Sequence, residues 1–292
     1  MRRFRDVVQS GKFSVSAELT LKKESTASEI NCQVDALSGL ADGIQVTDNP
    51  WSWTQMSAIS AASLVLRREV DPIPVLSCRD RNRIALQSDL VGLRALGVTS
   101  ILLTRGQPIP KNHPLQAMAV FDTTGLQLVE MANSLNEEPS TDPNETFFIG
   151  TTARAFRSGD NWKSKSLKVK TRAGARFLQT QLCFNTNIIR RYIEVLIREK
   201  LTWKCSVIVS LAILPSVETV IWLMKNLPYT KIPVSLAKRI ESAADPEREG
   251  IKICVELMHE LAEMPGISGV NLMTMGNPES IVEAIRASGL RT

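Results

Sequence analysis

The chain has 292 residues, of which 43% are hydrophobic and 22% charged, and its formal net charge is +5. This balance is typical of a folded globular protein and excludes a disordered one. The positive excess is too small and too dispersed to indicate nucleic-acid binding, and the longest apolar runs are too short to cross a bilayer.

The cysteines, the histidines and the N-terminal residues indicate the redox environment of the protein, its localisation and its capacity for metal binding. The five cysteines are scattered and show no CxxC spacing, which indicates reduced thiols. The N-terminal residues MRRFRDVVQSGKF lead into no sustained apolar run, so we expect no signal peptide and a cytoplasmic protein. Two distant histidines, His113 and His259, without clustered thiols argue against a metal site.

Short apolar runs alternate along the chain with segments of helical character, and they are mostly continuous, as in a parallel sheet covered by helices. Strands are expected at 13–19, 43–46, 73–76, 100–103, 147–150, 177–181, 205–210 and 269–273. Helices are expected at roughly 27–40, 54–68, 82–96, 124–135, 164–174, 186–200, 216–226, 247–263 and 278–288. Residues 105–112 and 136–145 are expected to be long loops.

Eight such repeats predict a (β/α)₈ TIM barrel that forms a single domain over residues 1–292. A doubly wound sheet would alternate in the same way, but no GxGxxG follows any of the strands. Barrel sites lie where the strands end, so the polar residues there are the candidates. They are Glu18, Thr47, Asp48, Asn49, Ser77, Thr104, Arg105, Gly106, Gln107, Thr151, Thr152, Thr180, Gln181, Asn271 and Thr274.

Three features of the sequence allow two interpretations each. Glu18 lies in an apolar context that should raise its pKa, unless an arginine pairs with it. The turn CRDRNR (78–83) suits a structural lattice of Arg and Asp that also caps the next helix. The basic run KSKSLKVKTR (163–172) is either a solvated helix face or an anion-facing patch for phosphates or a polycarboxylate.

The strand FLQTQ (177–181) places two glutamines on one face. Buried amides need hydrogen-bond partners. Gln179 and Gln181 therefore either satisfy each other or nearby backbone groups, or one of them faces a polar ligand.

Several motifs resemble the methylenetetrahydrofolate reductase family of bacterial type, close to the subgroup with CRDRNRIALQSDL. They are VTDNP (46–50), SCRDRNRIALQSDL (77–90), the RG turn at Arg105 and Gly106, AVFD (119–122), FFIG (147–150) and KTRAGARFLQTQLCF (170–184). The similarity runs from SAELT (16–20) to the C-terminal helix. It implies a (β/α)₈ barrel that binds FAD at the strand ends and reduces 5,10-methylenetetrahydrofolate to 5-methyltetrahydrofolate with hydride from NAD(P)H.

The resemblance also assigns roles. Glu18 matches the general acid, and Gln181 matches a glutamine that binds the pterin of the folate, with Gln107 near the same ligand. Gln179 is then expected to bond within the barrel. The flavin would be contacted by Thr47, Asp48, Ser77, Arg105, Gly106, Phe121 and Thr151, and its phosphate-bearing tail by Lys170.

Several positions depart from the family pattern. Gln107 stands where an acidic residue is usual, and Val75, Met118, Ser166 and Val169 replace polar or basic residues of relatives. These departures leave FMN, or direct hydride transfer without flavin, as alternatives to FAD. They also leave open a folate-binding partner subunit in methyl transfer that is not a reductase. The family resemblance further allows a homo-oligomer or a second subunit.

Overall fold

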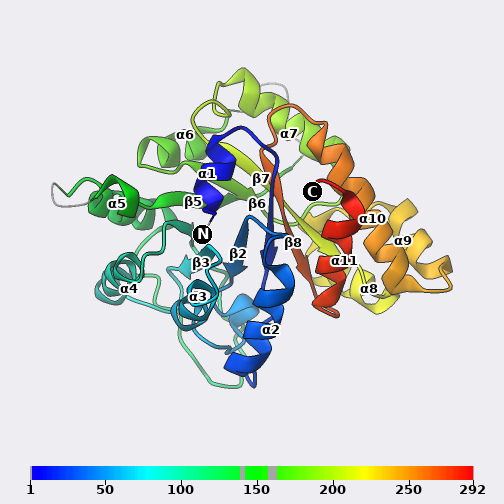
Figure 1. The fold of residues 1–292 in the computed structure, drawn as a ribbon, viewed down its shortest axis with the longest axis horizontal. Helices are drawn as coiled ribbons and strands as arrows, with labels where there is room; N and C mark the ends of the chain where they lie inside the picture. The colour runs from blue at the N-terminus through cyan, green and yellow to red at the C-terminus, as the bar shows by residue number, and fades with distance from the viewer. Residues whose placement is uncertain (1, 139–141, 157–162, 292) are drawn as a thin grey trace.

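The computed structural model describes residues 2–138, 142–156 and 163–291, and its strands form a closed parallel barrel in chain order. This confirms the predicted (β/α)₈ barrel. The helices surround the strands (Figure 1). The strands are β1 (Ser14–Glu18), β2 (Gly43–Val46), β3 (Pro72–Ser77), β4 (Ser100–Thr104), β5 (Phe148–Ala153), β6 (Phe177–Thr180), β7 (Ser206–Ile213) and β8 (Gly269–Thr274).

Most of the outer helices begin at side chains that cap them. Thr26 and Thr124 form capping boxes, while Asn82, Asn185 and Asp245 each accept a bond from a backbone N–H in the first turn. The helices are α2 (Ala27–Leu37), α3 (Ala58–Leu66), α4 (Arg83–Ala95), α5 (Gly125–Asn136), α6 (Lys165–Arg172), α7 (Thr186–Arg198), α8 (Val217–Asn226), α9 (Val234–Ser242), α10 (Pro246–Ala262) and α11 (Glu279–Ser288). Of these, α6, α9 and α11 have no side-chain cap.

A further helix, α1 (Phe4–Gln9), closes the N-terminal end of the barrel, and the sequence analysis did not predict it. The Phe4 ring packs edge-on against Phe177 at 5.6 Å and Phe148 at 6.3 Å between ring centroids. The backbone N–H of Phe4 donates to Asp71 Oδ2 at 2.8 Å. Six residues are too few to show a helical period, so the sequence gives little signal for this plug. Helix α9 was missed as well.

Above this apolar layer the barrel interior becomes polar. Ser16 Oγ donates to Asn271 Oδ1 at 2.8 Å, and Gln179 Nε2 donates to Ser210 Oγ at 3.1 Å. The prediction that Gln179 bonds within the barrel is therefore confirmed. These buried side chains are hydrogen-bonded to one another, as buried polar groups generally are. The barrel interior is therefore apolar around Phe4, near the N-terminal ends of the strands, and becomes polar farther along them.

Most expected elements lie within a few residues of the observed ones. The expected loop at 105–112 is longer, because no helix or strand occurs between β4 and α5. The expected loop at 136–145 falls partly outside the described residues and otherwise contains a short 3-10 turn, Pro143–Glu145. Among the helices that the structure describes, none has both the length and the apolar character needed to cross a membrane.

Candidate functional site

Glu18 is the last residue of β1 and lies opposite Gln45 in the register of β1 and β2. Gln45 Nε2 donates to Glu18 Oε2 at 2.9 Å. Burial raises the pKa of Glu18 from 4.5 to about 7, although the Gln45 bond lowers it in part. Gln45 Oε1 is buried and has no hydrogen-bond partner among the described residues. The carboxyl is therefore poised to hold a proton near neutral pH, as the sequence analysis expected.

A cavity of about 230 Å³ opens beside Glu18 at the C-terminal end of the barrel. It spans the ends of β1, β2, β6, β7 and β8. Its walls are largely apolar, which accounts for the desolvation of the carboxyl. The lining includes Glu18, Leu19, Thr20, Thr47, Trp51, Gln55, Leu182, Ala212, Leu223, Met273 and Thr274.

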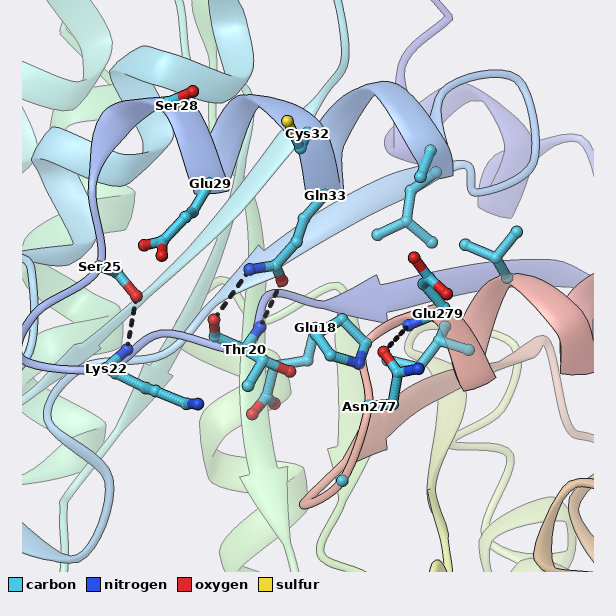
Figure 2. Close-up of a pocket in the computed structure, with 16 residues that line it drawn as sticks. Glu18, Thr20, Lys22, Ser25, Ser28, Glu29, Cys32, Gln33, Asn277 and Glu279 are labelled. Carbon is cyan, nitrogen blue, oxygen red and sulfur yellow. Dashed lines mark hydrogen bonds between the residues drawn. The ribbon is translucent and has the colours of Figure 1, made fainter. Parts of the chain in front are cut away.

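A second cavity of about 410 Å³ lies on the other side of Glu18, between α2 and α11 (Figure 2). Gln33 of α2 forms part of its wall and holds the backbone of Thr20 through two hydrogen bonds, 3.0 and 3.1 Å long. Asn277 and Glu279, at the start of α11, lie to the right of Glu18 in this view. Glu18 therefore lines two separate hollows at one end of the barrel.

The CRDRNR turn after β3 forms the predicted Arg–Asp lattice. Arg79 pairs with Asp80 at 2.6 Å, and Arg81 makes two bonds to Asp48 at 2.6 and 2.9 Å. Asp48 also accepts the backbone N–H of Ser77 at 2.9 Å. The carboxylate of Asp48, a predicted flavin contact, is thus already engaged in holding two neighbouring turns together.

Other predicted flavin contacts gather at the ends of β3 and β4. Gly106 has φ +84°, and a Cβ there would lie 2.9 Å from Arg79 Cβ, so this turn fits only glycine. Ser77 Oγ is buried without a partner among the described residues. The Arg105 guanidinium lies 4.7 Å from the centroid of the Phe121 ring. Gln107, which follows this turn, is exposed.

Thr151 of β5 is placed differently from the other candidates. Its neighbour Ile149, two residues before it on the same face of the strand, packs with residues of α4 and α5 on the outside of the barrel. Thr151 is fully buried on that outer face. Thr152 is on the inner face, where its Oγ1 lies 3.3 Å from Thr104 Oγ1.

A third cavity, of about 330 Å³, lies between β5 and α6 and is lined by cations. Lys170 Nζ donates to the carbonyl oxygen of Thr152 at 3.3 Å, and burial lowers the pKa of this amine. Arg154, Lys163 and Lys165 line the same cavity. The basic run therefore contributes to a hollow and is not merely a solvated face, a geometry that suits an anionic ligand.

Gln181 follows β6, and its Oε1 accepts a bond from Arg154 Nε at 3.1 Å. The next residue, Leu182, lines the cavity that contains Glu18. Gln181 is thus bonded to a side chain of the cationic cavity, but it is not among the residues that line that cavity or the cavity containing Glu18.

A flavin fits this arrangement in part. Ser77 has an orphan hydroxyl, Gly106 leaves room for a close approach, and Lys170 lies in a cationic hollow that suits phosphate groups. Asp48 and Thr151 do not fit as direct contacts, because one is paired and the other faces the helices. Among the described residues no group of three or more His, Cys, Asp or Glu is placed to hold a metal ion.

The sequence analysis missed Gln45, Trp51 and Met273. Gln45 lies in the apolar strand GIQV, and the sequence does not show that it is paired with Glu18. Its position opposite Glu18 in the strand register is what places its amide against the carboxyl. Trp51, in the PWSW segment of the turn that follows β2, was a usable signal, because an exposed aromatic residue at a barrel rim suits ligand binding.

The chain belongs to the methylenetetrahydrofolate reductase family, whose model matches residues 3–289. No curated protein sequence matches it. Similar folds include an uncharacterized protein from Clostridium thermocellum that binds two copies of 5-methyl-5,6,7,8-tetrahydrofolic acid, with 14% identity, 97% of each chain covered and a TM-score of 0.65. DmoA from Hyphomicrobium sulfonivorans has 10% identity, with 94% of this chain and 86% of that chain covered and a TM-score of 0.56. At these identities the likeness supports the barrel alone.

Proposed function

We propose that the protein reduces 5,10-methylenetetrahydrofolate to 5-methyltetrahydrofolate with hydride from NAD(P)H, and that Glu18 is the general acid. The observation that carries this proposal is Glu18 itself, whose pKa is raised to about 7 beside an apolar cavity of about 230 Å³. We further propose that the chain belongs to the subgroup marked by CRDRNRIALQSDL.

The five-membered ring of the folate must open before hydride can reach the bridging carbon. Ring opening leaves an electrophilic iminium at N5 and needs a proton at the departing nitrogen, N10. A carboxyl with a pKa near the working pH is the efficient donor for such a step. Glu18 holds this proton, and Gln45 fixes the orientation of the carboxyl through Oε2. The apolar walls exclude water that would compete for the proton.

Gln181 and Gln107 are proposed as amide partners for the pterin. Gln181 already bonds Arg154, so binding would exchange this contact for one to the substrate. The residues proposed to hold a flavin are Thr47, Ser77, Arg105, Gly106, Phe121 and Lys170, because Asp48 is paired and Thr151 faces the helices. A bound flavin would relay the hydride from the nicotinamide to the folate.

The test separates the two half-reactions. Glu18→Gln keeps the shape of the side chain but cannot donate the proton, so we expect folate reduction to fall by about 10²-fold or more. Oxidation of NAD(P)H by added flavin should continue at the rate of the unmodified protein. Glu130→Gln, on the exposed side of α5, is the matched control. An equal loss of both half-reactions in Glu18→Gln would refute the assignment of Glu18 as the general acid.

A second candidate is a folate-binding partner in methyl transfer that has no reductase activity or uses no flavin. It is favoured by the engagement of Asp48 with Arg81 and by the outward placement of Thr151, which remove two expected flavin contacts. The similar barrel that binds methyltetrahydrofolate is consistent with it. Titration with FAD and FMN, followed through the visible flavin spectrum, decides between the two. Folate binding without flavin binding or folate-dependent NAD(P)H oxidation would favour this second function.

A further inference from the structure

The turn after β2 contains an unusual concentration of backbone strain. Asn49, Trp51 and Ser52 have φ values of 44°, 52° and 68°, in the left-handed region that non-glycine residues rarely adopt. Bulky residues occupy this region only where the surrounding structure forces them to, and such positions cluster at ligand sites. We refer to residues 49–52 as the Trp51 turn.

Contacts from three segments hold the Trp51 turn in place. Arg79 Nη2, from the CRDRNR lattice, donates to the carbonyl oxygen of Asn49 at 2.9 Å. Asn49 Oδ1 accepts the backbone N–H of Gln55 at 3.3 Å. His113 Nε2, from the loop between β4 and α5, lies 2.9 Å from the carbonyl oxygen of Ser52. The strained conformation is therefore imposed by the fold around it.

The result of this strain is the position of one indole ring. Trp51 is 40% exposed, and it lines the cavity that contains Glu18. Its ring packs edge-on against Trp222 of α8, with 5.2 Å between centroids and an interplanar angle of 74°. The contact with Trp222 restrains the indole, while 40% of Trp51 stays exposed and open to a ligand.

We propose that Trp51 is the platform on which the flat fused heteroaromatic ring of the ligand stacks beside Glu18. The cavity has a volume of about 230 Å³, and Leu182 and Met273 give it apolar wall area next to the polar side chains of Thr47 and Gln55. Stacking on Trp51 would orient the polar edge of that ring toward Glu18. The pterin of a folate and the isoalloxazine of a flavin share this chemistry, and the choice of the pterin rests on the proposed function.

The experiment measures binding to the full chain by calorimetry with three probes: 5-methyltetrahydrofolate, p-aminobenzoylglutamate, which lacks the pterin, and FMN. Trp51→Ala should weaken binding of the stacked ring about tenfold, within the range known for heteroaromatic rings on aromatic side chains. Trp51→Phe should restore most of this loss. Trp53→Ala is the matched control, because Trp53 is 64% exposed and lies near His113.

The probes distinguish the source of the ring. Loss for methyltetrahydrofolate with no change for p-aminobenzoylglutamate identifies the pterin, and loss for FMN alone identifies the flavin; either supports the platform. Equal affinities in Trp51→Ala and Trp53→Ala, or no binding of any probe to the unmodified protein, would overturn it. If Trp51→Ala fails to fold, Trp51→Leu carries the same comparison. A Trp51-dependent affinity together with undiminished folate reduction in Glu18→Gln would refute the acid while leaving the platform intact.

Discussion

The raised pKa of Glu18 makes a prediction about stability that needs no substrate. Burial favours the protonated carboxyl in the folded state and raises its pKa from 4.5 to about 7. A difference of about 2.5 units corresponds to about 3 kcal/mol, at about 1.4 kcal/mol per unit. The protonated form therefore contributes stability that is fully present below pH 4.5 and is lost as the pH rises through 7. Glu18→Gln has a neutral side chain of the same shape at every pH, so this variant should keep that stability as the pH rises.

The assay is urea unfolding of both proteins at intervals between pH 4 and 9. Relative to the unmodified protein, Glu18→Gln should gain up to about 3 kcal/mol in unfolding free energy by pH 8, with most of the gain appearing between pH 5 and 7. Taking the difference cancels every other titrating group in the chain. Glu130→Gln should track the unmodified protein throughout. Parallel curves for Glu18→Gln and the unmodified protein would refute the argument that burial holds the proton on this carboxyl.

Three further changes test other parts of the structure. Gln45→Met removes the bond that lowers the pKa of Glu18, so the alkaline limb of folate reduction should move to higher pH; a rate profile between pH 6 and 9 that does not move would contradict this. Burial raises the pKa of Asp71 from 3.8 to about 6, so its ionisation destabilises the fold increasingly from pH 4 upward. At pH 8, the unfolding free energy of Asp71→Asn in urea should therefore exceed that of the unmodified protein by about 3 kcal/mol. A lower unfolding free energy there would disprove the claim that the ionised Asp71 destabilises the fold. Gly106→Ala should destabilise by at least about 1 kcal/mol more than Gly97→Ala, because both have φ +84° but only Gly106 has a side chain 2.9 Å from the added carbon; equal thermal shifts would show that backbone strain alone matters.

The barrel was predictable from sequence because its strands are short apolar runs that alternate regularly with helical segments. The exceptions were α1 and α9. The first is too short for a helical period, and it forms because Phe4 finds an aromatic pocket made by β5 and β6. No local pattern encodes that pocket, since its two phenylalanines lie more than 140 residues along the chain.

The candidate site was predictable only where the strand period could be applied. Glu18 was found because it ends an apolar strand, and its raised pKa follows from burial. Thr151 was misplaced toward the mouth because the position of a residue at a strand end does not by itself give its face. Counting by twos from Phe148, which packs inside the barrel, assigns the inner face to Thr152.

The motifs that mark the family have mainly a scaffolding function in this chain. Arg79, Asp80 and Arg81 of CRDRNR bond one another, Asp48 and the Trp51 turn, so these three charged groups build the rim and are already engaged with protein partners. Two groups of the described residues line cavities at the mouth: the acid at β1 and the cations between β5 and α6. A ligand that used both would have to extend across the barrel mouth. The flat ring of a folate would use the acidic side, whereas the phosphate-bearing tail of a flavin and the glutamate carboxylates of a folate are both anions that would suit the cationic side. Lys170→Met should therefore weaken the binding of FMN and leave the binding of a pterin without the glutamate tail unchanged, and this difference separates a flavin site from a pterin site within one protein.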